Sequence, residues 1–176
     1  MPQLIKQGTV IVDCWVLVRE AESLADLVDG EPVIVPLAFW LQARAVLIAR
    51  GNACVWLRPD DDPATIAPDL RFLPVIAIDF PVFTDGRGYS TARLLRERYA
   101  YQGELRAIGD VQRDQLQYLT HSGFDAFALR AGDDAQAALE SLRELSDGYQ
   151  ATGLRTPWFQ RRADTSPPDG VRFPGA

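Results

Sequence analysis

The chain is nearly without histidine and lysine, and this narrows the chemistry open to it. Among its 176 residues, His121 is the single histidine and Lys6 the single lysine. A single histidine leaves little material for a Ser-His-Asp triad, a Cys-His pair or a zinc site. We therefore expect none of these three classes of site.

Cysteine is equally scarce. Cys14 and Cys54 both lie in apolar, strand-like runs, and their separation does not match the spacing of metal ligands. We expect two reduced core residues and no disulfide.

Long apolar runs and excess positive charge are also missing. No apolar run approaches the roughly 20 residues that cross a bilayer, and the N-terminus lacks the pattern of a signal peptide. A net charge of -6 disfavours a nucleic-acid partner, which needs a basic face. We expect a cytoplasmic protein that binds neither membrane nor nucleic acid.

What remains is an alternation of short apolar runs and helical stripes. Residues 3–18 predict two strands that form a hairpin around Gln7 and Gly8, and residues 36–50 predict a helix. Four strand-helix repeats follow, from about residue 53 to 150, as in successive βαβ units. The expected class is α/β with a mainly parallel sheet, either an open doubly wound sheet or half of a (β/α)8 barrel.

We expect one domain over residues 1–150, with a hairpin layer at 1–35 and βα repeats at 36–150. Residues 151–176 are rich in Pro, Gly and Arg and indicate an extended tail. Its aromatic pair followed by two arginines, within residues 157–162, could dock a partner or pack back on the domain.

The stretch around which the chain is organised is residues 75–90, VIAIDFPVFTDGRGYS. An apolar run ends there in a carboxylate and opens into a glycine-spaced loop, which is typical of a buried parallel strand that leads into a helix. The carboxyl ends of parallel strands share one rim. We therefore expect four polar segments to converge: residues 60–62, 79–90, 109–114 and 130–134.

Arg87 is the candidate anion ligand, because its planar fork of donors matches oxyanions and glycines let the backbone approach closely. The spacing is neither that of a Walker loop nor Gly-x-Gly-x-x-Gly, so no nucleotide is assigned. The structural alternative is that Arg87 pairs with a carboxylate and stiffens the loop. The predicted ligand-binding residues are Gly86, Arg87, Gly88, Tyr89, Ser90 and Arg106; Arg106 could equally pair with a carboxylate.

Four carboxylates could serve as general acid or base if burial raised a pKa toward neutrality: Asp79, Asp85, Asp110 and Asp114. A structural alternative stands beside each, because Asp110 could cap a helix and Asp85 could shape a turn. Three further acids, Asp60, Asp61 and Asp62, could suit a hard cation, but their place before Pro63 favours helix capping. We predict no metal site.

No flavin, nicotinamide, haem or iron-sulfur motif is present that would name a cofactor, so we expect a colourless protein. The identity of any cofactor stays unknown at this stage. Whether the chain is an enzyme stays open as well.

Taken together, four segments resemble the bacterial family known as domain of unknown function nine-three-four: residues 79–90, 103–110, 114–116 and 123–127. The resemblance covers roughly residues 36–150. Members of that family are commonly labelled probable oxidoreductases and are typically encoded beside the sulfite reductase of assimilatory sulfate reduction. The resemblance therefore implies a role in sulfur assimilation. Many relatives have Arg-Cys where this chain has His121 and Ser122, which argues against thiol chemistry here.

Two functional hypotheses follow. The first, which we favour, is an accessory protein that supports sulfite reductase, or another sulfur-assimilation protein, by docking, assembly or electron delivery. The second is a small enzyme that binds a sulfur oxyanion or a phosphorylated compound through Arg87 and uses an Asp as acid or base. A homodimer is also expected, because a half barrel leaves two strand edges open.

Overall fold

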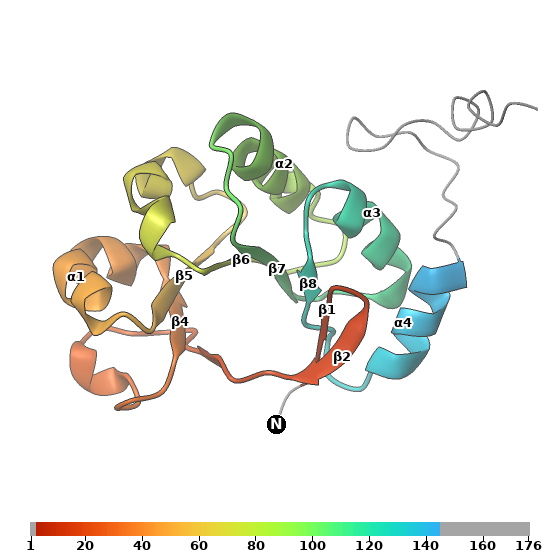
Figure 1. The fold of residues 1–176 in the computed structure, drawn as a ribbon, viewed down its shortest axis with the longest axis horizontal. Coiled ribbons are helices and arrows are strands. Elements are labelled where there is room, and N and C mark those ends of the chain that lie inside the picture. The colour runs from red at the N-terminus through yellow and green to blue at the C-terminus, as the bar shows by residue number, and fades with distance from the viewer. Residues whose placement is uncertain (1–2, 145–176) are drawn as a thin grey trace, which may run out of the picture.

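The computed structural model describes residues 3–144, which form one curved, eight-stranded sheet with helices on its convex side (Figure 1). The strand order is β2-β1-β8-β7-β6-β5-β4-β3. Strands β3 to β8 are parallel, and β1 is antiparallel to both β2 and β8. The strands are β1 (Gln3–Lys6), β2 (Thr9–Val12), β3 (Val16–Leu17), β4 (Val33–Pro36), β5 (Ala53–Leu57), β6 (Val75–Phe80), β7 (Glu104–Gly109) and β8 (Ala126–Phe127).

This architecture confirms the predicted α/β class and its half-barrel form, with an N-terminal hairpin. The helical segments lie in the connections between parallel strands and after β8, and none in the described part of the chain is long and apolar enough to cross a membrane. They are η1 (Leu24–Asp26), α1 (Leu37–Arg50), η2 (Pro63–Phe72), α2 (Arg87–Arg93), η3 (Leu94–Arg98), η4 (Arg113–Gln115), α3 (Leu116–His121) and α4 (Ala135–Glu144). The predicted tail at 151–176 lies outside the described residues.

Strand β6 shows how an apolar run becomes the centre of the sheet. All six of its residues are buried, and alternate side chains point to opposite faces. Ile76 and Ile78 pack in the core under the helices, whereas Val75 and Ala77 pack on the concave face. By the same alternation Asp79 belongs to the concave face, at the carboxyl end of the strand.

Residues 13–19, here called the strap, cover the concave face. Figure 1 shows the chain crossing from β2 at one edge of the sheet to β3 at the other. Trp15 and Leu17 pack against a concave-face cluster that includes Cys54 and Trp56. The Trp56 indole N–H also donates to the carbonyl of Val18 at 3.0 Å. A parallel sheet needs cover on both faces, and the strap supplies the second cover.

Two sequence-based boundaries are corrected here. The hairpin strand expected to run to residue 18 ends at Val12, because the Asp13 carboxylate accepts the Trp15 amide at 3.1 Å and turns the chain into the strap. The run at β4, expected in the hairpin layer, is a full member of the parallel sheet between β3 and β5. Short apolar runs carry too little pattern to fix which neighbour they pair with.

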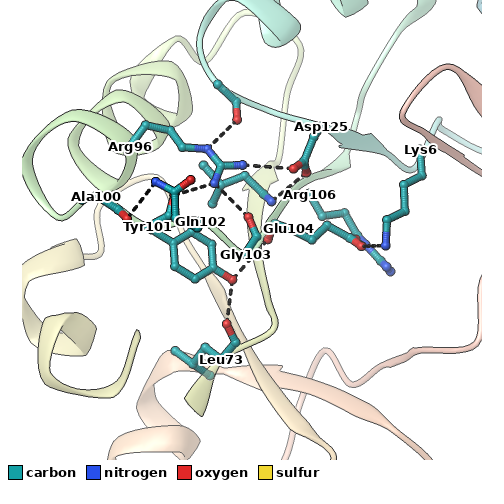
Figure 2. A network of polar contacts seen from close by, with 12 residues as sticks. Lys6, Leu73, Arg96, Ala100, Tyr101, Gln102, Gly103, Glu104, Arg106 and Asp125 are labelled. Atoms are coloured by element: carbon teal, nitrogen blue, oxygen red, sulfur yellow. Dashed lines mark hydrogen bonds and ion pairs between the residues drawn. The ribbon is translucent and has the colours of Figure 1, made fainter. Parts of the chain in front are cut away.

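Charged side chains connect the strap to the sheet. Arg106, only 3% exposed, pairs with Asp13 of the strap at 2.7 Å and with Glu104 at 2.7 Å. Glu104 in turn accepts from Lys6 of β1 at 2.7 Å (Figure 2). This chain of charges, buried except at Lys6, joins β1, β7 and the strap. Of the two alternatives for Arg106, the structure shows the pairing with carboxylates.

A second polar cluster fixes the amino ends of β7 and β8 (Figure 2). Arg96 donates to the carbonyls of Tyr101, Gly103 and Gly123 at 2.6 to 2.9 Å and pairs with Asp125 at 3.1 Å. Asp125 also accepts the Leu105 amide at 2.9 Å. These contacts explain why polar residues stand beside the apolar runs at both strand starts.

The two cysteines differ in environment, so the expectation of two core residues is wrong for Cys14, which lies in the turn after β2, and the two thiols should differ in reactivity. Cys14 is exposed, whereas Cys54 is buried, and burial raises the pKa of the Cys54 thiol to about 12. Because the thiolate is the reactive form, we expect an aromatic disulfide reagent at mildly alkaline pH to modify only Cys14 in the native protein. Both thiols should react after unfolding. Rapid modification of Cys54 in the folded protein would contradict the buried concave face.

Arg106→Met tests the charge chain under the strap. The variant leaves Asp13 and Glu104 without their buried partner, so we expect the free energy of unfolding to fall by roughly 3 kcal/mol. Urea denaturation measures this change. The exposed Arg113→Met is the matched control and should change stability by less than about 0.5 kcal/mol. Equal stability of the two variants would show that the strap is held by other contacts.

Candidate interaction site at the carboxyl ends of the strands

Because β5 to β8 are parallel, the loops at their carboxyl ends lie on one rim of the half barrel. The loop after β6 reaches the residue after β7, since the Phe83 amide donates to the Asp110 carboxylate at 3.1 Å. Arg130, after β8, lies 3.7 Å from the same carboxylate. The rim therefore joins three of the four polar segments through direct contacts.

The loop between β6 and α2, residues 81–86, is anchored by its backbone. Besides the Asp110 bond to the Phe83 amide, the Gln115 side chain donates to the Phe83 carbonyl at 2.9 Å. The Asp85 amide donates to the Val82 carbonyl at 3.0 Å and closes the turn. Both backbone polar groups of Phe83 are thus held by side chains from beyond β7.

Two large side chains of this loop are apolar and exposed. Val82 and Phe83 are each 52% exposed, in a loop whose backbone is fully engaged at Phe83. Gln115 also lies 3.4 Å from the Tyr89 hydroxyl, and the Tyr89 ring packs edge-on against Tyr118, which is itself exposed. We call Val82, Phe83, Tyr89 and Tyr118 the rim patch.

Two of the predicted acid-base residues are held by arginines. Asp79 is largely buried and accepts from Arg19 of the strap at 2.6 Å. Asp85 accepts from the Arg87 side chain at 3.0 and 2.7 Å and from the Arg87 amide. These bonds from Arg87 lower the pKa of Asp85, which is the opposite of the shift that a neutral-pH base requires.

The other two carboxylates, Asp110 and Asp114, lie in different surroundings. Asp110 holds the Phe83 amide and does not cap the following helix; Gln112 stands at the N-cap of η4, and its own amide donates to Gln115 at 3.0 Å. That corrects the capping alternative for Asp110. Asp114 is exposed and lines a shallow hollow of 460 Å³ beside Arg113 and Arg130. The four carboxylates therefore differ in what they contact: Asp79 and Asp85 pair with arginines, Asp110 holds a backbone amide, and Asp114 lines the hollow.

The residues predicted to bind an anion either bond to other residues of the protein or lie apart from one another. Two nitrogens of the Arg87 guanidinium donate to Asp85, so the structure shows the pairing alternative for this side chain. Gly88 serves packing, because a Cβ there would lie 2.7 Å from the Phe80 ring. Gly86 and Ser90 are exposed at either side of Arg87, whereas Arg106 lies under the strap and does not join them.

The acidic run after β5 closes a turn. The Asp61 carboxylate accepts the Arg58 amide at 2.7 Å, and Asp62 caps η2 by accepting the Ala64 amide at 2.9 Å. This confirms the capping interpretation for Asp62. Within residues 3–144 no group of three His, Cys, Asp or Glu residues is arranged to hold a metal ion.

Sequence reasoning did not single out Phe83 and Gln115. The available signal was the pair Val82 and Phe83, two large apolar residues in a loop expected to be polar. Gln115 gave no signal of its own, because its two partners come from different connections.

The effect of sulfate on thermal stability distinguishes anion binding by Arg87 from its pairing with Asp85. Because Asp85 already occupies the guanidinium fork, we expect sulfate to raise the melting temperature of the wild type and of Arg87→Ala equally. Thermal melts with and without sulfate measure this. A larger response in the wild type, only partly retained in Arg87→Lys, would establish a bidentate anion site instead.

Comparison with known proteins gives one finding. The family model described as "Bacterial protein of unknown function (DUF934)" matches residues 54–159, which include every rim loop from β5 onward. No curated protein and no solved structure matches the chain. Since the match covers more than half of the 176 residues, the chain belongs to this family of bacterial proteins of unknown function, DUF934.

Proposed function

We propose that this protein is an accessory protein of assimilatory sulfite reduction that docks on sulfite reductase through the rim patch. The observation that carries the proposal is the anchoring of Phe83, whose amide and carbonyl are both held while its side chain stays half exposed. The sulfur-assimilation context comes from the family resemblance described above.

Anchored apolar side chains are suited to binding. Ordering a loop on association costs free energy, and a loop already fixed by Asp110 and Gln115 avoids most of that cost. Aromatic residues dominate the energetics of many protein interfaces, and burying one removes a large apolar area from water. Phe83 therefore has the chemistry of an anchor residue that inserts into a pocket on a partner.

The surroundings of the rim patch also match an interface. Charged residues of both signs lie near it: Asp85 and Arg87 pair in the segment between Phe83 and Tyr89, and Asp110, which holds the Phe83 amide, lies 3.7 Å from Arg130. An apolar centre with a polar border is the usual anatomy of a protein interface. The pairing of Asp79 and Asp85 with arginines is consistent with a docking role.

The test compares two exposed phenylalanines. Full-length tagged protein is added to extract of the native cell at low salt, and the sulfite reductase that it retains is measured by mass spectrometry and by enzyme activity. We expect Phe83→Ser to reduce retention by about tenfold, since an interface anchor is lost. Phe72→Ser is the control, because Phe72 is 41% exposed on η2 and outside the rim patch.

A second variant examines the anchoring itself. Gln115→Ala keeps the Phe83 side chain but removes the bond to its carbonyl, so retention should fall about fivefold, as for one lost hydrogen bond. Failure of the wild type to retain sulfite reductase would contradict the proposed partner. Equal retention by wild type and Phe83→Ser would contradict the proposed surface.

A further inference from the structure

Two arginines stack on one tryptophan where the strap ends. The guanidinium carbon of Arg19 lies 5.4 Å from the centre of the Trp56 ring, and that of Arg58 lies 5.8 Å from it. Trp56 is only 4% exposed, whereas Arg58 is exposed and the Arg19 side chain is 47% exposed. The buried ring therefore supports two guanidinium groups that reach solvent, and we call Arg19 and Arg58 the arginine pair.

The register of the sheet brings the arginine pair to one place. Arg58 follows the last paired residue of β5, and Asp79 follows the partner of that residue in β6, so the two are neighbours across the sheet. Asp79 is largely buried and accepts from Arg19 at 2.6 Å. The pair therefore meets at the carboxyl ends of β5 and β6, the end at which folds with parallel strands usually bind ligands.

Most hydrogen-bond donors of the arginine pair are free. A guanidinium that stacks on a ring keeps its N–H groups available in its own plane. Within residues 3–144, Arg58 forms no ion pair, and Arg19 donates to Asp79 through Nη1 alone. Two positive charges therefore stand against the single carboxylate that contacts them.

The acidic run after β5 lies close to Arg58 but is directed elsewhere. The Asp61 carboxylate accepts the Arg58 backbone amide, and the Asp62 carboxylate accepts the Ala64 amide. Neither carboxylate pairs with the Arg58 guanidinium. Their negative charges still reduce the attraction for an anion, so any complex formed here should be weak and needs a method that detects weak binding.

We propose that the arginine pair binds a small tetrahedral oxyanion, of the class of inorganic sulfate and phosphate. Such an ion has oxygens enough for two guanidinium forks at once. Stacking on Trp56 orients both side chains before binding, and Asp79 also holds Arg19, which lowers the cost of ordering them.

This site is separate from the two surfaces described above. It shares no residue with the rim patch, and it does not use Arg87, whose fork Asp85 already occupies. Sulfate bound at the arginine pair would therefore raise the melting temperature of the wild type and of Arg87→Ala alike.

An NMR titration of the full-length, nitrogen-15-labelled protein is the test. Sulfate, phosphate and acetate are added in turn, with sodium chloride adjusted to keep the ionic strength constant. We expect sulfate and phosphate to shift the indole N–H signal of Trp56 and the Nε–H signal of Arg58 along saturable curves. Acetate should bind more weakly, because its two oxygens and single charge suit only one fork. Trp56→Phe assigns the indole signal among those of the four tryptophans.

Three variants locate the site. Arg58→Met should raise the dissociation constant for sulfate at least about tenfold, because hydrogen bonds to a charged group are lost. Arg58→Lys keeps the charge without the planar fork and should recover only part of the affinity. Arg71→Met is the matched control, because Arg71 is an exposed arginine that stacks on Phe72 at 4.6 Å, outside the pair. The amide spectrum of each variant checks its fold.

The outcomes decide between binding and a purely structural role, in which the arginines only cover Trp56. Saturable shifts that Arg58→Met weakens and Arg71→Met retains would support the proposal. The absence of saturable shifts in the wild type with both sulfate and phosphate would overturn it, and so would equal affinity in Arg58→Met. Acetate binding as tight as that of sulfate would overturn the assignment to a tetrahedral oxyanion. None of these outcomes depends on sulfite reductase.

Discussion

A half barrel of parallel strands has two apolar faces, and covering the second of them is the constraint on which this structure depends. Helices cover the convex face, as in any βα repeat. A complete (β/α)8 barrel fills its interior with layers of side chains from all of its strands. Here the strap covers the concave face, with Trp15 and Leu17 as its apolar contacts and Asp13 and Arg19 as its charged ends.

Because the strap covers the concave face, that face is not open to a ligand or a partner. Arg106 and Glu104 lie on the concave face, but they hold β1, β7 and the strap together. The ionic partners of the rim carboxylates Asp79 and Asp85 are likewise arginines of the same chain. What the molecule presents outward instead is the anchored loop with Phe83. An exposed apolar side chain on a fixed backbone suits a protein contact, and this is why docking is the proposed function.

The motifs of the family resemblance divide into two structural groups. Glu104, Arg106 and Asp125 secure the strands, and burial raises the pKa of the Asp125 carboxyl above its ordinary value, although Arg96 acts to lower it. Such a group stabilises the fold most at low pH and loses this contribution as pH rises through its raised pKa. The second group, Asp110 and Gln115, secures the loop that carries Phe83. In the proposed function, the second group is the one that bears on binding.

Local patterns predicted the parts of the fold that local physics determines. The buried runs of β5 to β7, the cap at Asp62 and the hairpin turn at Gln7 and Gly8, both with positive φ, follow from near neighbours. Tertiary partners could not be predicted in the same way. The partner of Arg106 is Asp13, 93 positions away, and no sequence period links them.

The same limit applies to the candidate site. The convergence of the loops after β6, β7 and β8 follows from the order of strands and helices, so the rim could be predicted. The exposure of Phe83 could not, because it depends on Asp110 and Gln115 reaching back from the next connection.

Hydrogen exchange of the full-length protein, with and without sulfite reductase, tests the central claim most directly. That claim is that partners bind the preformed rim while the strap stays closed over the concave face. The account predicts added protection of amides in residues 81–86 and 113–118 and unchanged exchange in the strap and in β7. Unchanged exchange in the loop, with altered exchange in residues 13–19 and 104–106, would contradict it.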